Sequence, residues 1–242
     1  MIAIKITNSL GESLVLSPAE DKFRIKKVSG LSPQGGTIST QKMAKHGTRF
    51  ANSTTDERNI VIDLNVVGDI EANRDLLYIA CPPSMDVIVE LQTDKKHATI
   101  EGWVETCEVD FFQKITVGQI SIICPDPFFK ASEVAYAVDA EAVTVKSSCP
   151  FETGYGVSVA FTEAAEGFTL TNQSTGKALI ITYDFVAGDI LEIDTEERTV
   201  NINGMNAYNT KSGDWNLLKY GDNQITASSP ATLNFIDRYI GM

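Results

Sequence analysis

Apolar and polar residues alternate with a period of two through much of the first half of the chain. The alternation runs through segments 60–67, 86–93, 99–109 and 115–124. Successive side chains of a β-strand point to opposite faces of a sheet, so this pattern is typical of strands with one buried face. We therefore expect these segments to form an antiparallel sheet with short connections.

One segment breaks the alternation and favours a helix. Residues 69–80, DIEANRDLLYIA, begin with Asp69, whose side chain can cap a first turn, and Pro82 and Pro83 follow the end of the segment. Proline cannot continue a helix because it lacks the backbone N–H that the helix needs. The first half is thus predicted to be mainly β, with one short helix packed on the sheet.

Residues 30–58 differ in composition from the segments on either side. They are rich in Gly, Ser, Thr and Lys and contain few large apolar residues. A polar segment of this length inside a β domain is usually either disordered or a functional arm. The composition leaves both interpretations open.

The stretch CPDPFF ends the strand pattern of the first half. Its two prolines cannot donate hydrogen bonds to a neighbouring strand, and they restrict the residues before them. Beyond the stretch the charged residues become predominantly acidic. We interpret it as the exit from a first domain, with the linker anchored by the two phenylalanines, and predict domains at 1–129 and 130–242. The exit residues are Cys124, Pro125, Asp126, Pro127, Phe128 and Phe129.

The second half reads as many short strands joined by turns. Segment 189–204, DILEIDTEERTVNING, contains two alternating runs around a polar turn and ends with Asn203 and Gly204. An Asn-Gly dipeptide favours the tight turns of β-hairpins. Short strands with frequent turns are typical of a β-sandwich, which we expect for the second domain.

Composition excludes several classes of function. The net charge of −12 argues against direct binding of nucleic acid, because the phosphates would be repelled. No apolar run is long enough to suggest insertion in a membrane. The chain also lacks a phosphate-binding loop, a nucleophile elbow and a zinc-protease motif.

The cysteines and histidines do not form a recognisable catalytic or metal-binding pattern. Metal sites place two ligands close together in sequence, and the cysteines here lie far apart, so we expect reduced thiols in the core. Neither histidine is paired with a cysteine by any sequence feature. We therefore predict a protein that is not an enzyme and uses no cofactor or metal. The residues concerned are Cys81, Cys107, Cys124, Cys149, His46 and His97.

Two basic stretches, 22–27 and 42–49, stand out in this acidic chain. Charged residues on a strand edge discourage unwanted pairing, so solvated edges are one interpretation. The other is that the basic residues meet acidic surface on another copy of the chain. Of the two tryptophans, Trp103 lies in an alternating strand and is expected in the core. Trp215 lies at a loop-to-strand junction, where it either anchors the loop or core or stacks on a sugar.

Several motifs follow one another in a fixed order along the chain: ERNIVIDL, EGWVETCEVDFF, CPDPFF, DILEIDTEERTVNING and LLKYGDNQITAS. In this order and spacing the chain resembles, over nearly its whole length, the distal tail proteins of phages that infect Gram-positive bacteria and the related components of phage-like particles. The matching positions of the second domain are Asp194, Thr195, Arg198, Val200, Asn203, Gly204, Leu218, Gly221, Asn223 and Ile225.

The resemblance implies a structural hub. Its members have a β-barrel-like N-terminal domain that assembles into a hexameric ring and a galectin-like C-terminal sandwich. The ring joins the tail tube to the tail-tip or baseplate proteins, lets DNA pass through its lumen and offers a docking platform for receptor-binding proteins. We accordingly expect a homo-hexamer at the virion tail tip, assembled in the bacterial cytoplasm. The candidate ring contacts are Lys26, Lys27, Lys42, Lys45, His46 and Arg49.

Two alternatives remain beside the hub. A carbohydrate-binding module for host adhesion would suit a galectin-like sandwich, but both histidines lie in the first domain and Trp215 is isolated in the second. Fold alone does not confer sugar binding. A tail-tube protein with an added decoration domain would also form hexamers and share a related barrel.

Overall fold

The computed structural model describes residues 3–44, 46–110 and 115–242. The chain forms two compact units, Met1–Lys130 with Ile240–Met242 and Ala131–Tyr239. The last three residues therefore belong to the first unit, whereas the sequence placed them in the second domain. Among the described residues, no helix is both long and apolar enough to cross a bilayer.

The first unit is built on an antiparallel sheet with strand order β2-β1-β7-β8-β9-β6-β3. The structure confirms the four strands that the alternation predicted, which are β6, β7, β8 and β9. The end strands meet at a bridge between Ser17 and Arg24, which gives the curled, barrel-like arrangement expected from the sequence. The short β10 pairs with β8 through Lys130 and Thr99. The strands are β1 (Ala3–Asn8), β2 (Ser13–Leu16), β3 (Phe23–Ser29), β6 (Arg58–Val66), β7 (Asp86–Gln92), β8 (His97–Asp110), β9 (Val117–Cys124) and β10 (Phe129–Lys130).

The predicted helix is present as α1 (Ile70–Ala80). As expected, Asp69 is its N-cap, and the carboxylate accepts a hydrogen bond from the Ala72 N–H at 3.2 Å. Leu77 is fully buried against the sheet. The buried Asn8 side chain of β1 donates to the Ile79 carbonyl at 3.1 Å, which satisfies an acceptor at the helix end.

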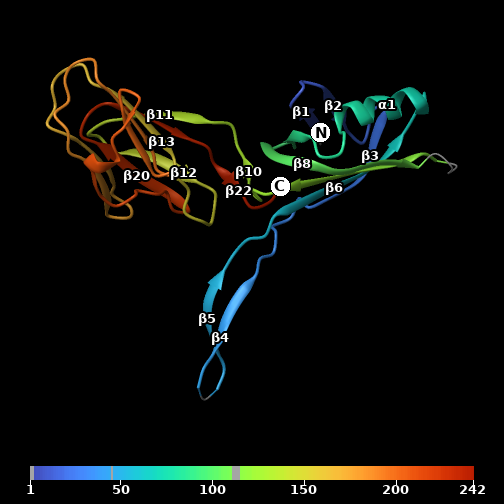
Figure 1. Ribbon diagram of the computed structural model, residues 1–242, viewed down its shortest axis with the longest axis horizontal. Coiled ribbons are helices and arrows are strands. Elements are labelled where there is room, and N and C mark those ends of the chain that lie inside the picture. The colour runs from blue at the N-terminus through green and yellow to red at the C-terminus, as the bar shows by residue number, and fades with distance from the viewer. Residues whose placement is uncertain (1–2, 45, 111–114) are drawn as a thin grey trace. The chain divides into compact units, whose positions relative to one another are not determined.

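The polar segment 30–58 contains an ordered hairpin. Strands β4 (Ile38–Lys42) and β5 (Thr48–Ser53) form a two-stranded sheet of their own, visible in Figure 1 as a separate blue hairpin. Every residue of both strands is exposed. Of the two interpretations of this segment, disorder and an arm, the structure supports an arm. We call residues 30–58 the arm.

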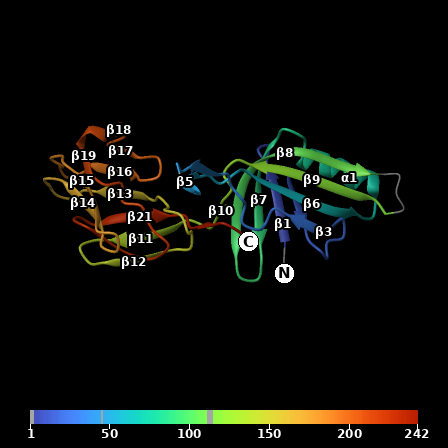
Figure 2. The ribbon, with the colours of Figure 1, turned by 90° about the horizontal axis from the view of Figure 1, so that it is seen from below.

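The second unit is a sandwich of two sheets, as the sequence predicted. Buried residues from both sheets, such as Leu191 and Leu170, contribute to one core. In Figure 2 the strands β21, β13 and β16 run side by side. One sheet contains β11 (Val134–Val138), β21 (Ala231–Phe235), β13 (Gly156–Ala160), β16 (Ile190–Asp194), β17 (Thr199–Ile202) and β18 (Met205–Asn206), and the other contains β12 (Val143–Ser147), β20 (Gly221–Ala227), β14 (Phe168–Asn172), β15 (Lys177–Ile181) and β19 (Lys211–Gly213), in these orders. A short 3-10 turn, η1 (Tyr208–Thr210), and the strand β22 (Arg238–Tyr239) complete the unit.

The Asn-Gly dipeptide forms a tight turn, between β17 and β18. Asn203 and Gly204 have φ angles of 52° and 74°, the left-handed values that a type I′ turn requires at both central positions. A separate turn, which contains Arg198 at a φ of 57°, joins β16 to β17. Segment 189–204 thus contains the predicted hairpin, formed by β16 and β17, and its Asn-Gly turn leads on to a third strand, β18.

Candidate functional site

The hairpin of the arm carries three of the predicted ring contacts. Lys42 lies at the end of β4, Arg49 lies in β5 and His46 lies in the turn between them, all exposed. Lys45 lies outside the described residues. Among the described residues, none of these three side chains forms an ion pair, so the basic groups face solvent in the single chain.

The same hairpin exposes large apolar side chains. Ile38, Met43 and Phe50 are 69%, 58% and 61% exposed. An isolated two-stranded hairpin is at best marginally stable in water. Apolar side chains on such an element gain stability when a second surface covers them, because burial removes their surface from water. The arm therefore has the chemistry of a contact element.

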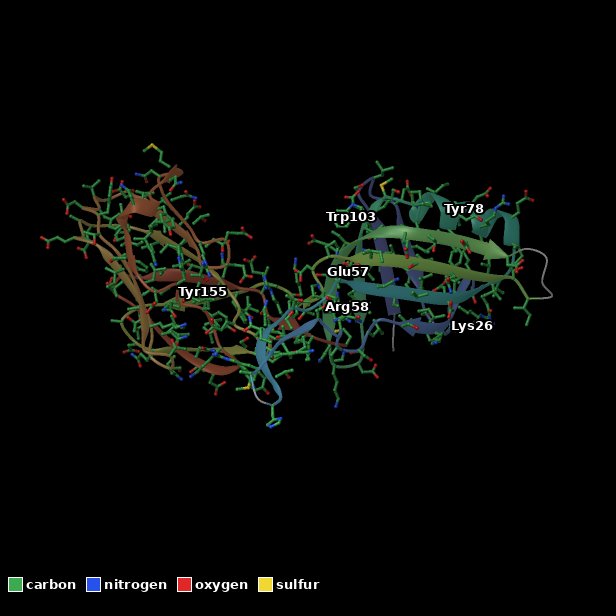
Figure 3. The ribbon with its side chains drawn as sticks, turned by 60° about the horizontal axis from the view of Figure 1, so that its bottom comes forward. Lys26, Glu57, Arg58, Tyr78, Trp103 and Tyr155 are labelled. Atoms are coloured by element: carbon green, nitrogen blue, oxygen red, sulfur yellow. The ribbon has the colours of Figure 1, made fainter. Side chains whose placement is uncertain are left out.

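The other two predicted ring contacts lie on β3, the last strand of the sheet order. Lys26 and Lys27 are both exposed. The register of β3 against β6 shifts between Ile25 and Lys27, so Lys26 occupies a β-bulge. Figure 3 labels Lys26 on this strand. Bulges and lysines on outer strands discourage strand pairing, which is the alternative role that the sequence left open. As ring contacts, all six residues remain predictions.

Sequence reasoning missed Arg58, a buried residue of the first unit whose side chain makes four hydrogen bonds (Figure 3). Its side chain is among the largest that are fully buried, with 1% of the residue exposed. The guanidinium donates to the carbonyls of Pro127 at 2.7 Å, Ser32 at 2.8 Å and Ile240 at 2.8 Å, and also to that of Gly30. Its carbon lies 4.4 Å from the centroid of the Phe129 ring.

These contacts place Arg58 where three separate parts of the chain meet. Gly30 and Ser32 begin the arm, Pro127 and Phe129 belong to CPDPFF, and Ile240 begins the C-terminal segment that returns to the first unit. Burial lowers the pKa of Arg58, and the nearby Cys124 opposes that shift. An arginine stays charged in proteins, so carbonyl dipoles and an aromatic face stabilise this cation.

A sequence signal for Arg58 did exist. The alternation of ERNIVIDL puts residue 58 on the same face as Ile60, Ile62 and Leu64, all fully buried. An arginine that continues the buried face of a strand predicts either a frayed strand end or a cation with buried partners.

Three of the exit residues, Cys124, Pro127 and Phe129, lie next to this arginine. Cys124 ends β9 directly opposite Arg58, and Pro127 and Phe129 are buried. Asp126 accepts a hydrogen bond from the Phe128 N–H at 3.2 Å and lies 3.4 Å from the Lys130 ammonium. Pro125 is exposed and Phe128 is half-buried. Phe129 thus anchors the stretch to the first unit. The role of the stretch as a domain exit stays a prediction.

The thiols have the properties of protonated core groups. Burial raises the pKa of Cys81 and Cys107 to about 12, and that of Cys124 to about 11. A thiol with such a pKa contains almost no thiolate at neutral pH and is a poor nucleophile and metal ligand. Among the described residues, no group of three or more His, Cys, Asp or Glu side chains is arranged to hold a metal ion.

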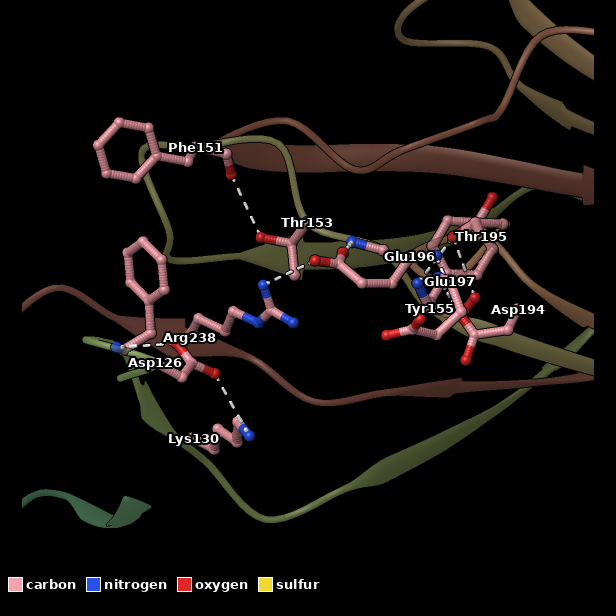
Figure 4. A network of polar contacts seen from close by, with 12 residues as sticks. Asp126, Lys130, Phe151, Thr153, Tyr155, Asp194, Thr195, Glu196, Glu197 and Arg238 are labelled. Carbon is pink, nitrogen blue, oxygen red and sulfur yellow. Dashed lines mark hydrogen bonds and ion pairs between the residues drawn. The ribbon is translucent and has the colours of Figure 1, made fainter. Parts of the chain in front are cut away.

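In the second unit, the motif residues of segment 189–204 stabilise its turns (Figure 4). The Asp194 carboxylate accepts hydrogen bonds from the N–H groups of Glu196 at 2.8 Å and Glu197 at 2.9 Å. The fully buried Thr195 hydroxyl accepts from the Tyr155 N–H at 2.8 Å and donates to the Tyr155 carbonyl at 3.0 Å. Glu196 in turn lies 3.0 Å from the Arg238 guanidinium.

The later motif residue Asn223 is fully buried at the start of β20. Its amide oxygen accepts from the Lys219 N–H and from the Asn172 side chain, each at 3.1 Å. Its amide nitrogen donates to the carbonyls of Lys219 at 2.8 Å and Gly221 at 3.0 Å. The short motifs of the sequence are therefore residues that hold turns and strand ends in place.

Of the two tryptophans, Trp103 lies away from its expected place, whereas Trp215 packs against the core, one of the places expected for it. Trp103 is 50% exposed on β8, which corrects its expected place in the core, because Gly102 and Val104 occupy the buried face instead. Trp215 packs against the core of the second unit and its ring is covered by the Lys211 ammonium at 4.5 Å. Tyr208 lies 6.1 Å from the Trp215 ring. Lys211 therefore occupies one face on which a sugar would stack.

Comparison with known proteins connects these features to a family. Residues 148–239 match the profile of the siphovirus-type tail component, C-terminal domain. The distal tail protein of Bacillus phage SPP1 is 25% identical to this chain over 235 residues, which cover 91% of this chain and 92% of that protein.

Solved structures show the same fold. The crystal structure of the SPP1 distal tail protein, described as a paradigm of the hub adsorption apparatus in phages infecting Gram-positive bacteria, superposes with a TM-score of 0.75 at 19% identity, over 98% of this chain and 99% of that one. A chain of the phage P2 baseplate in its activated conformation reaches a TM-score of 0.50 at 11% identity over the whole of both chains. Together these comparisons confirm the resemblance found in the sequence: the chain is similar to the phage distal tail proteins over nearly its whole length, and its residues 148–239 match the siphovirus-type tail component family.

Proposed function

We propose that this protein is a structural component of a phage tail tip, in which six copies form a ring between the tail tube and the baseplate. The observation that carries the proposal is the similarity to the SPP1 distal tail protein, which spans both units of the chain. Tail-tube and tail-tip or baseplate proteins would be its partners, and the virion tail its location. DNA would pass through the lumen of the ring.

The exposed arm supports the ring. A closed ring of identical copies needs two different surfaces per chain, one of which contacts the other on the next copy. A projecting hairpin with apolar and basic side chains is suited to be one of these surfaces. The six predicted contacts, Lys26, Lys27, Lys42, Lys45, His46 and Arg49, would then act between copies.

The second unit would serve as the docking platform for peripheral proteins such as receptor-binding proteins. Its galectin-like character is a prediction that the two-sheet sandwich is consistent with. A polar groove on its β13-β16-β17 sheet, with a volume of about 220 Å³, has no aromatic residue in its lining. Sugar sites commonly use aromatic stacking, so we favour protein docking over carbohydrate adhesion for this unit.

Light scattering of the purified chain over a concentration series tests the ring. We expect a mass six times the 26.4 kDa of one chain at high concentration. Lys42→Glu and Arg49→Glu, singly and together, should shift assembly to higher concentration, whereas Lys146→Glu on β12 makes the same charge change on an exposed residue of the second unit and should not. Equal effects of all three substitutions would remove the case for the arm.

A further inference from the structure

The hairpin of the arm presents one face that combines apolar and basic side chains. The register of the hairpin pairs Thr40 with Phe50 and Lys42 with Thr48. Directly paired residues share a face and alternate residues of a strand do so too, so Ile38, Phe50 and Lys42 lie on one face. This face therefore carries two large apolar side chains, Ile38 and Phe50, and a basic one, Lys42, near the hairpin turn.

A surface that would accept this face lies on the outer side of β1, β7 and β8. There Trp103 and Ile88 are 50% and 46% exposed on adjacent strands. The register pairs Ile88 with Glu101 and Asp86 with Trp103, so the two apolar residues are diagonal neighbours. Trp103, labelled in Figure 3, is the aromatic anchor of this patch.

The patch is hollowed and acidic. A groove of about 240 Å³ is lined by Thr7, Ser9, Asp86, Ile88, Glu101 and Trp103, among others. Its volume is below the roughly 300–1,000 Å³ of small-molecule sites, and it suits one or two side chains. The lining contains two carboxylates and no basic residue. The Glu101 side chain is 68% exposed, with Lys130 3.9 Å away, and remains accessible to a second cation.

We infer that this groove, which we call the Trp103 groove, receives the hairpin of a second copy of the chain, with Phe50 against Trp103 and Lys42 near Glu101. The inference rests on the proposed ring and names its second contact surface. Tryptophan is over-represented among the residues that contribute most to protein interfaces, and opposite charges at the rim fix the register of such contacts. The exposed apolar residues on both surfaces would be covered in the same event.

A second groove offers the structural control. It lies beside α1, has a volume of about 340 Å³ and is lined by Leu76, Ile79, Val15 and others, with Lys22 beside Glu12 and Glu20. It has no tryptophan, and its mixed charges complement a basic hairpin less well. Leu76 is 42% exposed, close to the 46% of Ile88, so the two positions are matched for accessibility.

Disulfide trapping between copies tests the inference on the full chain. Thr40→Cys leaves Phe50 in place and is combined either with Ile88→Cys in the Trp103 groove or with Leu76→Cys beside α1. After oxidation with copper phenanthroline, the first pair should give a ladder of covalent oligomers up to the hexamer on a non-reducing gel. The second pair, and each single variant, should give only the background of the natural cysteines.

Four further substitutions give an independent readout. Trp103→Ala should raise the concentration of half-assembly by about 30-fold, the loss typical of an interface hot spot, and Leu76→Ala should change it less than about twofold. Lys42→Glu should be rescued by Glu101→Lys. Three outcomes would overturn the inference without contradicting the proposed ring. They are a ladder from the Leu76 pair instead, an intramolecular disulfide without a ladder, and rings that form without either ladder. Failure of the unsubstituted chain to assemble at any concentration would overturn the proposed ring together with the inference.

Discussion

We expect Arg58→Met to destabilise the first unit more than any other single substitution that removes one of its charged side chains. Methionine retains much of the apolar stem and its contact with Phe129, and it removes all four hydrogen bonds of the guanidinium. The carbonyls of the arm root, the CPDPFF stretch and the C-terminal segment would then have to find other donors.

The size of the effect follows from the bonds that are lost. Hydrogen bonds to a charged group contribute about 1.5–3 kcal/mol each, so four give a gross loss of roughly 6–12 kcal/mol. The variant is spared the desolvation of a buried cation, which costs several kcal/mol, and we expect a net loss of about 4 kcal/mol in the free energy of unfolding. Such a loss is a large fraction of the roughly 5–15 kcal/mol that stabilises a typical domain.

Each unit contains one tryptophan, which makes the assay specific. In a Trp215→Phe background, the fluorescence of Trp103 reports the unfolding of the first unit alone when the chain is titrated with guanidinium chloride. Arg24→Met is the matched control, because Arg24 is exposed and, among the described residues, its side chain donates one hydrogen bond, to the Glu20 carbonyl at 3.0 Å. Its effect should stay below about 0.5 kcal/mol. An unfolding free energy of Arg58→Met within about 1 kcal/mol of the unsubstituted chain would refute the assigned role, since that is the typical effect of an average substitution.

Three other predictions follow from the site geometry. Asn223→Ala should destabilise the second unit by about 3 kcal/mol, because Asn172 and the Lys219 backbone lose their hydrogen-bond partner. The neighbouring Gln224→Ala should have little effect. The unfolding of both variants is followed by Trp215 fluorescence in a Trp103→Phe background. Hydrogen bonds from the Val186 N–H and the Asn203 side chain lower the pKa of Asp189 below its usual 3.8. The stability that they contribute should therefore be present above pH 3.8 and be lost as the pH falls through the lower pKa of the folded state. Asp189→Asn should flatten this dependence of the unfolding free energy on acid pH, and an unchanged slope would contradict the prediction. Iodoacetamide at pH 8 should label Cys81, Cys107 and Cys124 slowly in the folded chain and rapidly in denaturant, as their raised pKa values require, and fast labelling of the folded chain would contradict the burial of these thiols.

Alternation was sufficient to place the strands of the first unit, because a sheet with one buried face imposes a period of two. Segment 60–67 alternates Ile60, Ile62 and Leu64, and all three are fully buried in β6. The helix was predictable for a similar reason, since Asp69 supplies a cap and Pro82 and Pro83 follow its end.

Long-range partners could not be predicted in this way. The carbonyls that accept from Arg58 lie 26 to 182 residues away in sequence, and no local pattern specifies them. The hairpin of the arm lacks a buried face, so no alternation distinguished it from a disordered segment. Trp103 was misplaced because it was assigned to the buried face of its alternating strand, although it shares the parity of the exposed Glu101 and Glu105.

Electron microscopy of the purified full chain, at the concentration where its mass is highest, is the most direct test of the proposed ring. We expect closed rings with sixfold symmetry, and we expect Lys42→Glu with Arg49→Glu to abolish them at the same concentration. Particles that remain single copies at every concentration, or that form open filaments or rings of another symmetry, would contradict the proposed assembly.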